Sequence, residues 1–311
     1  MFPEGPFNRW EIIRKVGRFA ERRNDRSKKK GQGRKAGTRM FDKVMTVTGR
    51  EDTDMRILFI RHGDPDYVND TLTEKGHKEA SLLAEMAEEL EMGDCYQSPL
   101  GRAQATAAYS LEKLGKKAET LDWLREFPAK VDLNRSEELQ KAYNDTRMDG
   151  ERYGMRIVWD MLPDYLTRHS EYLDRELWRE SKVAQYSDLI SVYDKTVTEL
   201  DRLLECYGYV REGLHYRVVR ENTQTITCFC HFGIICVLLS HMWNVSPFVL
   251  WHALALAPTS VTEVVSEERE QGIAVFRGLR LGDISHLYRG RERASFSARF
   301  CETFGNKEQR H

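Results

Sequence analysis

The chain has 311 residues, of which 41% are hydrophobic and 31% are charged, and its formal net charge is −1. These values are typical of a globular protein with one large domain or two. No apolar stretch approaches the roughly 20 residues that span a bilayer, and no secretory signal is recognisable at the N-terminus. The six cysteines are scattered rather than framed, which favours reduced thiols. The sequence therefore predicts a cytoplasmic protein with no membrane partner.

Charge is distributed unevenly along the chain. Residues 1–50 contain 15 Lys and Arg against 5 Asp and Glu, and the remainder contains 33 against 44. Residues 1–54 are predicted to form a basic, disordered extension, because the run from Lys28 to Gly37 is charged and interrupted by glycine. Nucleic acid is an expected partner only through this extension. There are two alternatives to a functional extension. Residues 1–54 could be a solvated tail without a partner, or they could reflect the choice of an upstream start codon.

The first half of residues 55–311 alternates between strands and helices. Arg56–Ile60 is predicted as the first strand, because it is short, apolar and β-branched. Thr73 is a favourable N-cap for the helix that follows. Cys95–Gln97 is predicted as a second strand, and the next helix is expected to start with Ser98 as N-cap and Pro99 as first residue. That helix is expected to end near Leu114, and Glu119–Leu124 approaches a third strand.

Residues 128–185 break this alternation, since they are long, charged and rich in aromatic residues. We interpret them as helices outside the sheet that form a cap insertion. Ser187–Tyr207 is predicted as a helix, and Thr225–Cys230 as a strand followed at once by an apolar helix to Trp243. Two final strands are expected at Ser260–Ser266 and Ile273–Leu279. Such alternation predicts a three-layer α/β/α sandwich with a mostly parallel central sheet.

Charged and titratable residues follow several of the predicted strands. Arg61 and His62 follow the first strand, Glu126 follows the third, and His231 follows Thr225–Cys230. Arg102 lies in the first turns of the helix after Ser98, whose N-terminus also favours an anion. A parallel sheet would bring these positions to one edge, where α/β proteins bind ligands. A neutral imidazole, arginines and a carboxyl group suit phosphoryl transfer through a covalent intermediate.

These motifs resemble those of the histidine phosphatase superfamily, in its phosphoglycerate mutase-like branch. Four segments carry the resemblance, which covers about residues 55–127 and 222–290. They are Ile57–Gly63 with its Arg-His-Gly, Leu72–Ala80 with Leu-Thr-x-x-Gly-x-x-x-Ala, Gln97–Ala107 with Ser-x-x-x-Arg-Ala-x-x-Thr-Ala, and Leu124–Glu126 with Leu-x-Glu.

The resemblance implies a role for each candidate residue. His62 would be the phosphorylated nucleophile, and Glu126 the proton donor. Arg61, Arg102 and His231 would bind phosphate, with His231 among the catalytic residues. Asp64 and Asp66 lie close to His62 in sequence and are alternative donors. The resemblance implies no metal ion and no organic cofactor, and no carboxylate cluster with the spacing of a metal site lies near the motifs.

The sequence departs from the family pattern at two places. Phe232 follows His231 where glycine is usual, and Val68 stands where mutases usually carry an asparagine, with Asn69 one residue further on. The second departure favours a metal-independent phosphatase acting on a small phosphomonoester over a phosphoglycerate-type mutase. A catalytically silent phosphate-binding module is the remaining alternative. The sequence fixes neither the substrate nor the oligomeric state.

Overall fold

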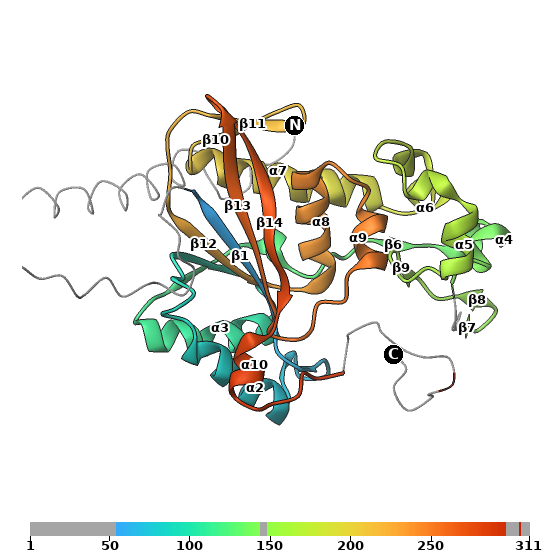
Figure 1. Ribbon diagram of the computed structural model, residues 1–311. Helices are drawn as coiled ribbons and strands as arrows, with labels where there is room; N and C mark the ends of the chain where they lie inside the picture. Colours follow the sequence, from blue (N-terminus) through green and yellow to red (C-terminus); the bar gives the residue numbers. More distant parts are fainter. Residues whose placement is uncertain (1–53, 144–147, 297–304, 306–311) are drawn as a thin grey trace, which may run out of the picture.

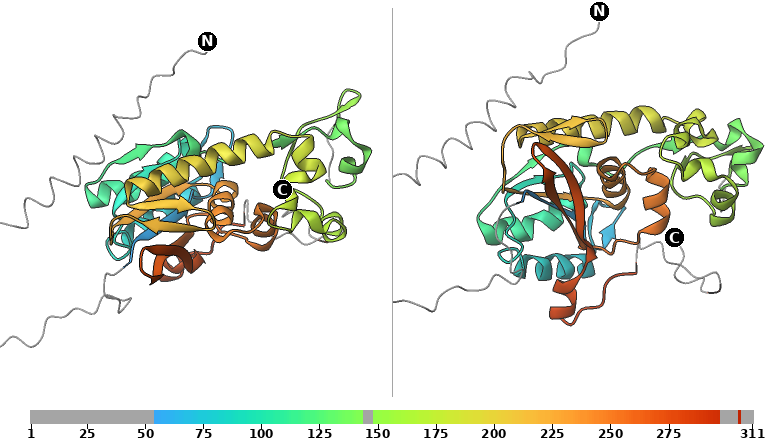
Figure 2. Two further views of the ribbon diagram at one scale, coloured as in Figure 1. Left: turned by 90° about the horizontal axis from the view of Figure 1, so that it is seen from above. Right: turned by 45° about the horizontal axis from the view of Figure 1, so that its top comes forward.

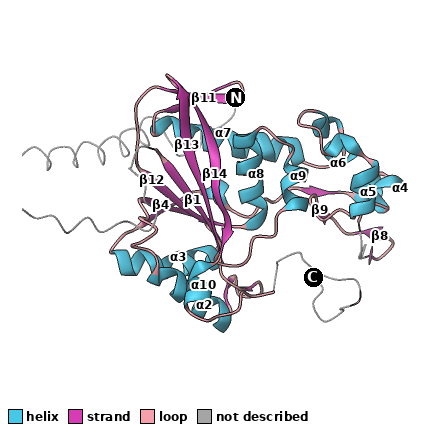
Figure 3. Cartoon of the chain, viewed as in Figure 1, coloured by secondary structure: helices cyan, strands magenta, loops and turns pink. Residues whose placement is uncertain are grey.

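The computed structural model describes residues 54–143, 148–296 and Gly305. The predicted extension of residues 1–54 lies almost entirely outside these residues, so its conformation and partners stay predictions. Among the described residues, helices pack on both faces of one large sheet (Figure 1), and Figure 3 separates the two kinds of element by colour. The predicted α/β/α sandwich is confirmed.

The central sheet has the strand order β10-β11-β14-β13-β1-β12-β4-β5. The neighbours β1, β12, β4 and β5 run parallel to one another. From β1 outward, β13, β14, β11 and β10 continue the sheet with antiparallel pairing. The strands span Arg56–Arg61 (β1), Asp94–Gln97 (β4), Ala118–Thr120 (β5), Tyr209–Glu212 (β10), His215–Val218 (β11), Thr225–Cys230 (β12), Val261–Glu270 (β13) and Ile273–Asp283 (β14).

Strands β1 and β12 form the centre of the fold and are covered on both faces. Every residue of β12 is buried, and so is every residue of β1 except Arg56 at its start. Successive side chains of a strand point to opposite faces. Leu58 and Ile60 accordingly pack in one hydrophobic cluster, and Ile57 and Phe59 in another. This double burial explains the short, continuously apolar runs of these strands.

Helices cover the two faces in separate groups (Figure 1). Helices α2 and α3 lie on one face with α10, and α7 and α8 lie on the other. Their bounds are Glu74–Glu85 (α2), Gly101–Leu114 (α3), Leu189–Cys206 (α7), Phe232–Trp243 (α8) and Ser285–Arg289 (α10). The Thr73 cap is confirmed, since its side chain accepts a hydrogen bond from the Gly76 N–H.

Two local predictions were wrong. Helix α3 begins at Gly101 with Leu100 as N-cap, not with Ser98 and Pro99. The Ser98 hydroxyl instead accepts the Leu100 N–H at 3.1 Å within the turn before the helix. The third strand is also shorter than predicted, because β5 ends at Thr120 and a 3₁₀ turn occupies Asp122–Leu124.

The segment between β5 and α7 lies outside the central sheet, to one side of it (Figures 1 and 2). Besides the predicted helices it contains two small antiparallel ribbons, β6–β9 and β7–β8, whose two-residue strands are too short to leave a pattern in the sequence. Its elements are β6 (Lys130–Val131), α4 (Glu137–Gln140), β7 (Met148–Asp149), β8 (Arg152–Tyr153), β9 (Arg156–Ile157), α5 (Pro163–Arg168) and α6 (Lys182–Gln185), with 3₁₀ turns at Leu133–Arg135, Ser170–Tyr172 and Leu177–Glu180.

Helix α9, Pro247–Ala253, joins this segment to the rest of the fold. The ring of Phe248 on α9 lies 5.0 Å from that of Tyr172, and the ring of Trp251 lies 5.6 Å from that of Trp159. Tyr172 and Trp159 belong to residues 128–185 and are buried. The segment and the sheet domain therefore share one hydrophobic core.

Candidate active site

The predicted site residues meet at one edge of the parallel part of the sheet. In the pairing of β1 with β12, Arg61 lies opposite Cys230, and in that of β12 with β4, Phe229 lies opposite Gln97. The three strands therefore end together. The residues that follow them are His62, His231 and Ser98, and all three are buried.

His62 is oriented by its own backbone. Its Nδ1 lies 2.7 Å from the Gly63 carbonyl oxygen. Because a carbonyl only accepts, Nδ1 carries the proton and Nε2 has the free lone pair. Burial lowers the pKa of His62 well below its usual 6.5, and the neighbouring charges of Arg61 and Arg102 act in the same direction. His62 is therefore a neutral imidazole, the state that a nucleophile requires.

Two guanidinium groups lie beside His62, and each is held by other residues. Arg61 donates to the Leu256 carbonyl through Nη1, and its guanidinium lies 5.7 Å from the Phe232 ring. Arg102 donates to Asp70 Oδ1 at 2.6 Å. The Nε atoms of both arginines are buried without a partner among the described residues. Each arginine therefore keeps at least one donor for a ligand.

His231 is held through its side chain. Its Nε2 lies 2.8 Å from Ser98 Oγ, and its ring centre lies 5.0 Å from that of His62. Ser98 Oγ already accepts the Leu100 N–H, so its own proton is available to His231 Nε2. When Ser98 donates to Nε2, the imidazole proton lies on Nδ1, which is buried and has no partner among the described residues. Burial lowers the pKa of His231 well below 6.5, so the ring is a neutral donor.

Glu126 lies in the loop after β5 and belongs to the same buried centre as His62 and the two arginines. Its Oε1 accepts the Phe127 N–H at 2.8 Å and the Ile234 N–H at 3.1 Å. Burial raises the pKa of Glu126 above its usual value, although these bonds and the nearby arginines oppose the shift. A carboxyl group that retains its proton to higher pH is suited to donate it.

The alternative donors have other contacts. Asp64 accepts hydrogen bonds from the hydroxyls of Thr73, at 2.7 Å, and Ser295. Asp66 lies in an exposed turn, where it accepts the Val68 N–H at 3.0 Å and bonds to Asn69. The bonds to Asn69 lower the pKa of Asp66. The geometry therefore supports Glu126 as donor, and its role stays a prediction.

The departures from the family pattern have separate structural settings. Phe232 begins helix α8, buried against the Arg61 guanidinium. The next residue, Gly233, is the one that must be small. A Cβ there would stand 2.7 Å from Glu126 Oε1 and 2.7 Å from the Trp159 ring. Val68 is 93% exposed and lies away from the buried centre.

Three residues near the site were missed in the sequence. Asp70 pairs with Arg102 and also accepts the Gly101 N–H at 2.7 Å, so a carboxylate occupies the start of α3. Trp159, from the segment outside the sheet, packs beside Glu126 across Gly233. Thr106 Oγ1 accepts the Gly63 N–H at 2.9 Å. Thr106 lies within a recognised motif, whereas Asp70 and Trp159 carry no comparable signal.

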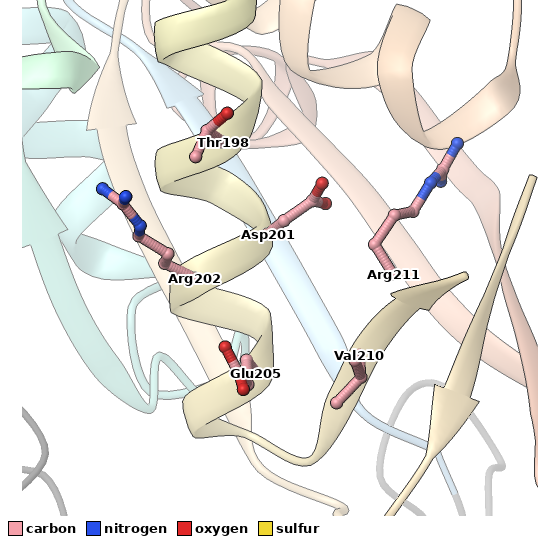
Figure 4. A pocket seen from close by; sticks show the side chains of 6 residues that line it. All are labelled: Thr198, Asp201, Arg202, Glu205, Val210 and Arg211. Atoms are coloured by element: carbon pink, nitrogen blue, oxygen red, sulfur yellow. The ribbon is translucent and has the colours of Figure 1, made fainter. Parts of the chain in front are cut away.

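Other features of the described residues lie apart from this centre. A hollow of about 230 Å³ lies between α7 and β10 and contains none of the predicted site residues (Figure 4). Within residues 54–143 and 148–296, no three or more His, Cys, Asp or Glu side chains are placed to hold a metal ion. No helix in these residues has the length and apolar character needed to cross a membrane.

Comparison with known families agrees with the motifs. The model of the histidine phosphatase superfamily (branch 1) matches residues 57–154, about a third of the chain, which supports the resemblance seen in the motifs. This range includes Arg61, His62, Arg102 and Glu126, while His231 lies beyond it. No curated protein sequence matches the chain.

Solved structures that resemble the chain include several phosphatases at low identity. A mutant phosphoserine phosphatase from Entamoeba histolytica in complex with phosphoserine is 17% identical, with a TM-score of 0.46, and the match covers 75% of this chain and 99% of that one. A mycobacterial glucosyl-3-phosphoglycerate phosphatase with inorganic phosphate is 16% identical, with a TM-score of 0.48, over 74% and 98% of the two chains.

Proposed function

We propose that the protein is a metal-independent phosphatase that hydrolyses a small phosphomonoester through a phosphohistidine on His62. One observation carries the proposal. Arg61 Nε, Arg102 Nε and His231 Nδ1 are buried donors without partners among the described residues, and all three residues lie beside His62. Most buried donors have a partner, so three unpartnered nitrogens around one histidine fit a ligand that offers acceptors. A phosphoryl group offers the matching acceptors.

The proposed reaction has two steps. In the first, His62 Nε2 forms a bond to phosphorus as the ester P–O bond breaks, and Glu126 gives its proton to the departing oxygen. Arg61, Arg102 and His231 hold the equatorial oxygens, where charge is spread in the transition state. In the second, Glu126 takes a proton from water as water attacks phosphorus, and the N–P bond breaks. Phosphate leaves, and His62 is neutral again.

A mutase is the closest alternative, and the enclosure of the site is the observation in its favour. His62 and Arg61 are each 2% exposed, and Trp159 covers the region beside Glu126. A mutase must keep water from the phosphohistidine long enough to return the phosphoryl group to another hydroxyl. The same enclosure also serves a phosphatase, because water-poor surroundings strengthen the contacts to phosphate.

The product separates these activities. We would incubate the full chain with a panel of sugar, glycerate and amino-acid phosphate esters and follow them by ³¹P NMR, with heat-denatured protein as control. A phosphatase gives inorganic phosphate, and a mutase gives an isomeric ester. Binding of phosphate without turnover of any ester, including p-nitrophenyl phosphate, would instead indicate the silent binding module.

We also propose a cytoplasmic location. The cysteines that the structure describes are Cys95, Cys206, Cys228, Cys230 and Cys236, and all are free thiols. Burial raises the pKa of the thiols of Cys228, Cys230 and Cys236, which keeps them protonated and unreactive. Cell fractionation tests this location directly.

A further inference from the structure

Thr259 has an unusual backbone conformation for its residue type. It is fully buried, and its φ of 57° lies in the left-handed region. A β-branched residue is an outlier there, because its side chain crowds the backbone. Such conformations persist only where the surroundings impose them, and they gather at functional sites. Thr259 lies just before β13, next to the loop that carries His62.

The conformation of Thr259 directs its N–H at the backbone of His62. The Thr259 N–H donates to the His62 carbonyl oxygen at 3.1 Å. The His62 carbonyl and the Gly63 N–H belong to one peptide group, and the Gly63 N–H donates to Thr106 Oγ1 at 2.9 Å. The His62–Gly63 peptide is therefore held from both sides. The Gly63 carbonyl, which accepts the His62 Nδ1 proton at 2.7 Å, belongs to the next peptide group, whose Asp64 N–H donates to Glu79 Oε2 at 3.0 Å.

The side chain of Thr259 is in turn held by His286 on α10. Thr259 Oγ1 lies 2.7 Å from the Pro258 carbonyl oxygen and 2.8 Å from His286 Nε2. A carbonyl only accepts, so the hydroxyl proton goes to Pro258 and His286 Nε2 must donate to the hydroxyl oxygen. Burial lowers the pKa of His286 to about 4, so the ring stays neutral near pH 7.

We propose that Thr259 and His286 are positioning residues that fix the tautomer and the direction of attack of His62. The contacts form a chain from His286 through the Thr259 hydroxyl and the Thr259 N–H to the His62 carbonyl. The His62–Gly63 peptide and the Gly63 carbonyl of the next peptide then pass the constraint to the imidazole. This inference rests on the proposed function, because it assigns the pair to the phosphoryl-transfer step. Neither residue touches the reacting atoms.

Two substitutions of Thr259 separate positioning from packing. Thr259→Val keeps the shape but loses the hydroxyl that holds the strained backbone. Thr259→Gly loses the side chain, yet glycine adopts a φ of 57° without strain and keeps the N–H in place. We expect kcat to fall about 10–100-fold in the valine variant, the range that misplacement of a reacting group causes, with little change in KM. The glycine variant should stay close to wild type. A packing role gives the opposite order, because glycine leaves the larger cavity.

His286 offers a second pair of variants. His286→Gln retains an N–H donor for the Thr259 hydroxyl, whereas His286→Leu removes it. We expect glutamine to restore most of the kcat that leucine loses. His77→Leu is the matched control, because it also removes a hydrogen bond between a histidine and a hydroxyl, that of Tyr109 at 3.1 Å, on α2 and α3. The control should keep its kcat.

A readout without substrate distinguishes this inference from the proposed function. ¹⁵N NMR of the full chain with labelled histidine reports which ring nitrogen of His62 carries the proton. Wild type and Thr259→Gly should show the Nδ1–H form, and Thr259→Val a mixture. This pattern in a protein that hydrolyses no ester would reject the phosphatase and retain the positioning. An unchanged tautomer in Thr259→Val, or a glycine variant that loses more kcat than the valine variant, would overturn the positioning role.

Discussion

The neighbouring strands β1 and β12 are each followed by a buried histidine, but the two histidines are held in different ways. His62 enters a loop in which the backbone carbonyl of Gly63 takes its Nδ1 proton. His231 precedes helix α8 directly, and the hydroxyl of Ser98 holds its Nε2. Opposite ring nitrogens therefore remain for a ligand. One imidazole offers a lone pair on Nε2, and the other offers a proton on Nδ1 when Ser98 donates to its Nε2.

This difference shows how local contacts can suit one residue type to two chemical roles. Both histidines follow parallel strands that end in register, and burial lowers the pKa of both. Their strand positions and ionisation states are therefore alike. Only the second hydrogen-bond partner differs, a carbonyl in one case and a hydroxyl in the other. A carbonyl fixes the proton on the ring nitrogen that faces it, whereas a hydroxyl can donate or accept, so the partner influences which nitrogen a neutral histidine offers to a ligand.

The largest effect should come from removing the nucleophile of this pair. His62→Ala should lower the turnover of phosphate esters by about 10⁴-fold or more, as loss of a covalent nucleophile does in other enzymes. Wild-type protein quenched during turnover should carry an acid-labile, alkali-stable phosphate on His62, seen by mass spectrometry, and the variant should carry none. Circular dichroism of the variant should match wild type. Sustained turnover in a folded variant would reject the covalent mechanism.

Glu126→Gln should have the next largest effect, and its size should depend on the leaving group. An alkoxide needs a proton to depart, and general acid help is typically worth about 10²–10⁴-fold. The variant should lose this much kcat/KM on sugar or glycerate esters. It should lose far less on p-nitrophenyl phosphate, because p-nitrophenolate leaves without a proton. Equal losses on both substrates would shift the acid role toward Asp64 or Asp66.

The sequence predicted the parts of this site that depend on strand ends. Arg61, His62 and His231 follow apolar runs that could only be buried strands, and parallel strands bring their ends together. Asp70 could not be predicted in the same way, because its contact with Arg102 joins a turn to the start of α3, and no periodicity relates these two places. The left-handed backbone conformation of Thr259 could not be predicted from the sequence either. A β-branched residue favours extended backbone, and the contacts that impose its φ of 57° come from distant parts of the chain.

Residues 128–185 show the same limit on a larger scale. Their aromatic content predicted a segment outside the sheet, but the two-residue strands of the β6–β9 and β7–β8 ribbons left no alternation to recognise. The position of Trp159 beside Glu126 depends on how this segment folds back on α9. Tertiary packing alone determines that placement.

Substitution of Ser98, which contacts His231, should have a smaller effect and tests whether His231 acts as a hydrogen-bond donor. Ser98→Ala removes the proton that holds His231 Nε2, so the ring can turn or change tautomer and Nδ1 no longer donates reliably. The hydrogen bond that would be lost is the one from His231 Nδ1 to the charged phosphate group. Such a bond is worth about 1.5–3 kcal/mol, or roughly 10–100-fold in kcat/KM. Ser110→Ala is the matched control, because Ser110 Oγ on α3 is buried with no partner among the described residues. Equal losses in both variants would show a packing effect.

The pH dependence should reflect His62 and Glu126 together. Turnover needs neutral His62, whose pKa lies well below 6.5, so the acid limb of kcat/KM should fall below pH 6.5. It also needs protonated Glu126, whose pKa is raised, so the alkaline limb should lie above the usual range of a glutamic acid. Each limb should change activity about tenfold per pH unit. In Glu126→Gln the alkaline limb should disappear, and an unchanged limb there would assign it to another group.

The smallest expected effect is that of removing metal ions. Arg61, Arg102 and His231 supply the positive charge and the donors that phosphate requires, and their free nitrogens are already buried at the site. In the described part of the chain, no group of three or more His, Cys, Asp or Glu side chains is arranged as a metal site. Excess EDTA should therefore leave the rate of phosphate release unchanged, measured beside a magnesium-dependent phosphatase that loses its activity in the same buffer. If EDTA stopped turnover and Mg²⁺ restored it, the arginines would not be sufficient, and the contrast between an attacking and a donating histidine would need a third participant.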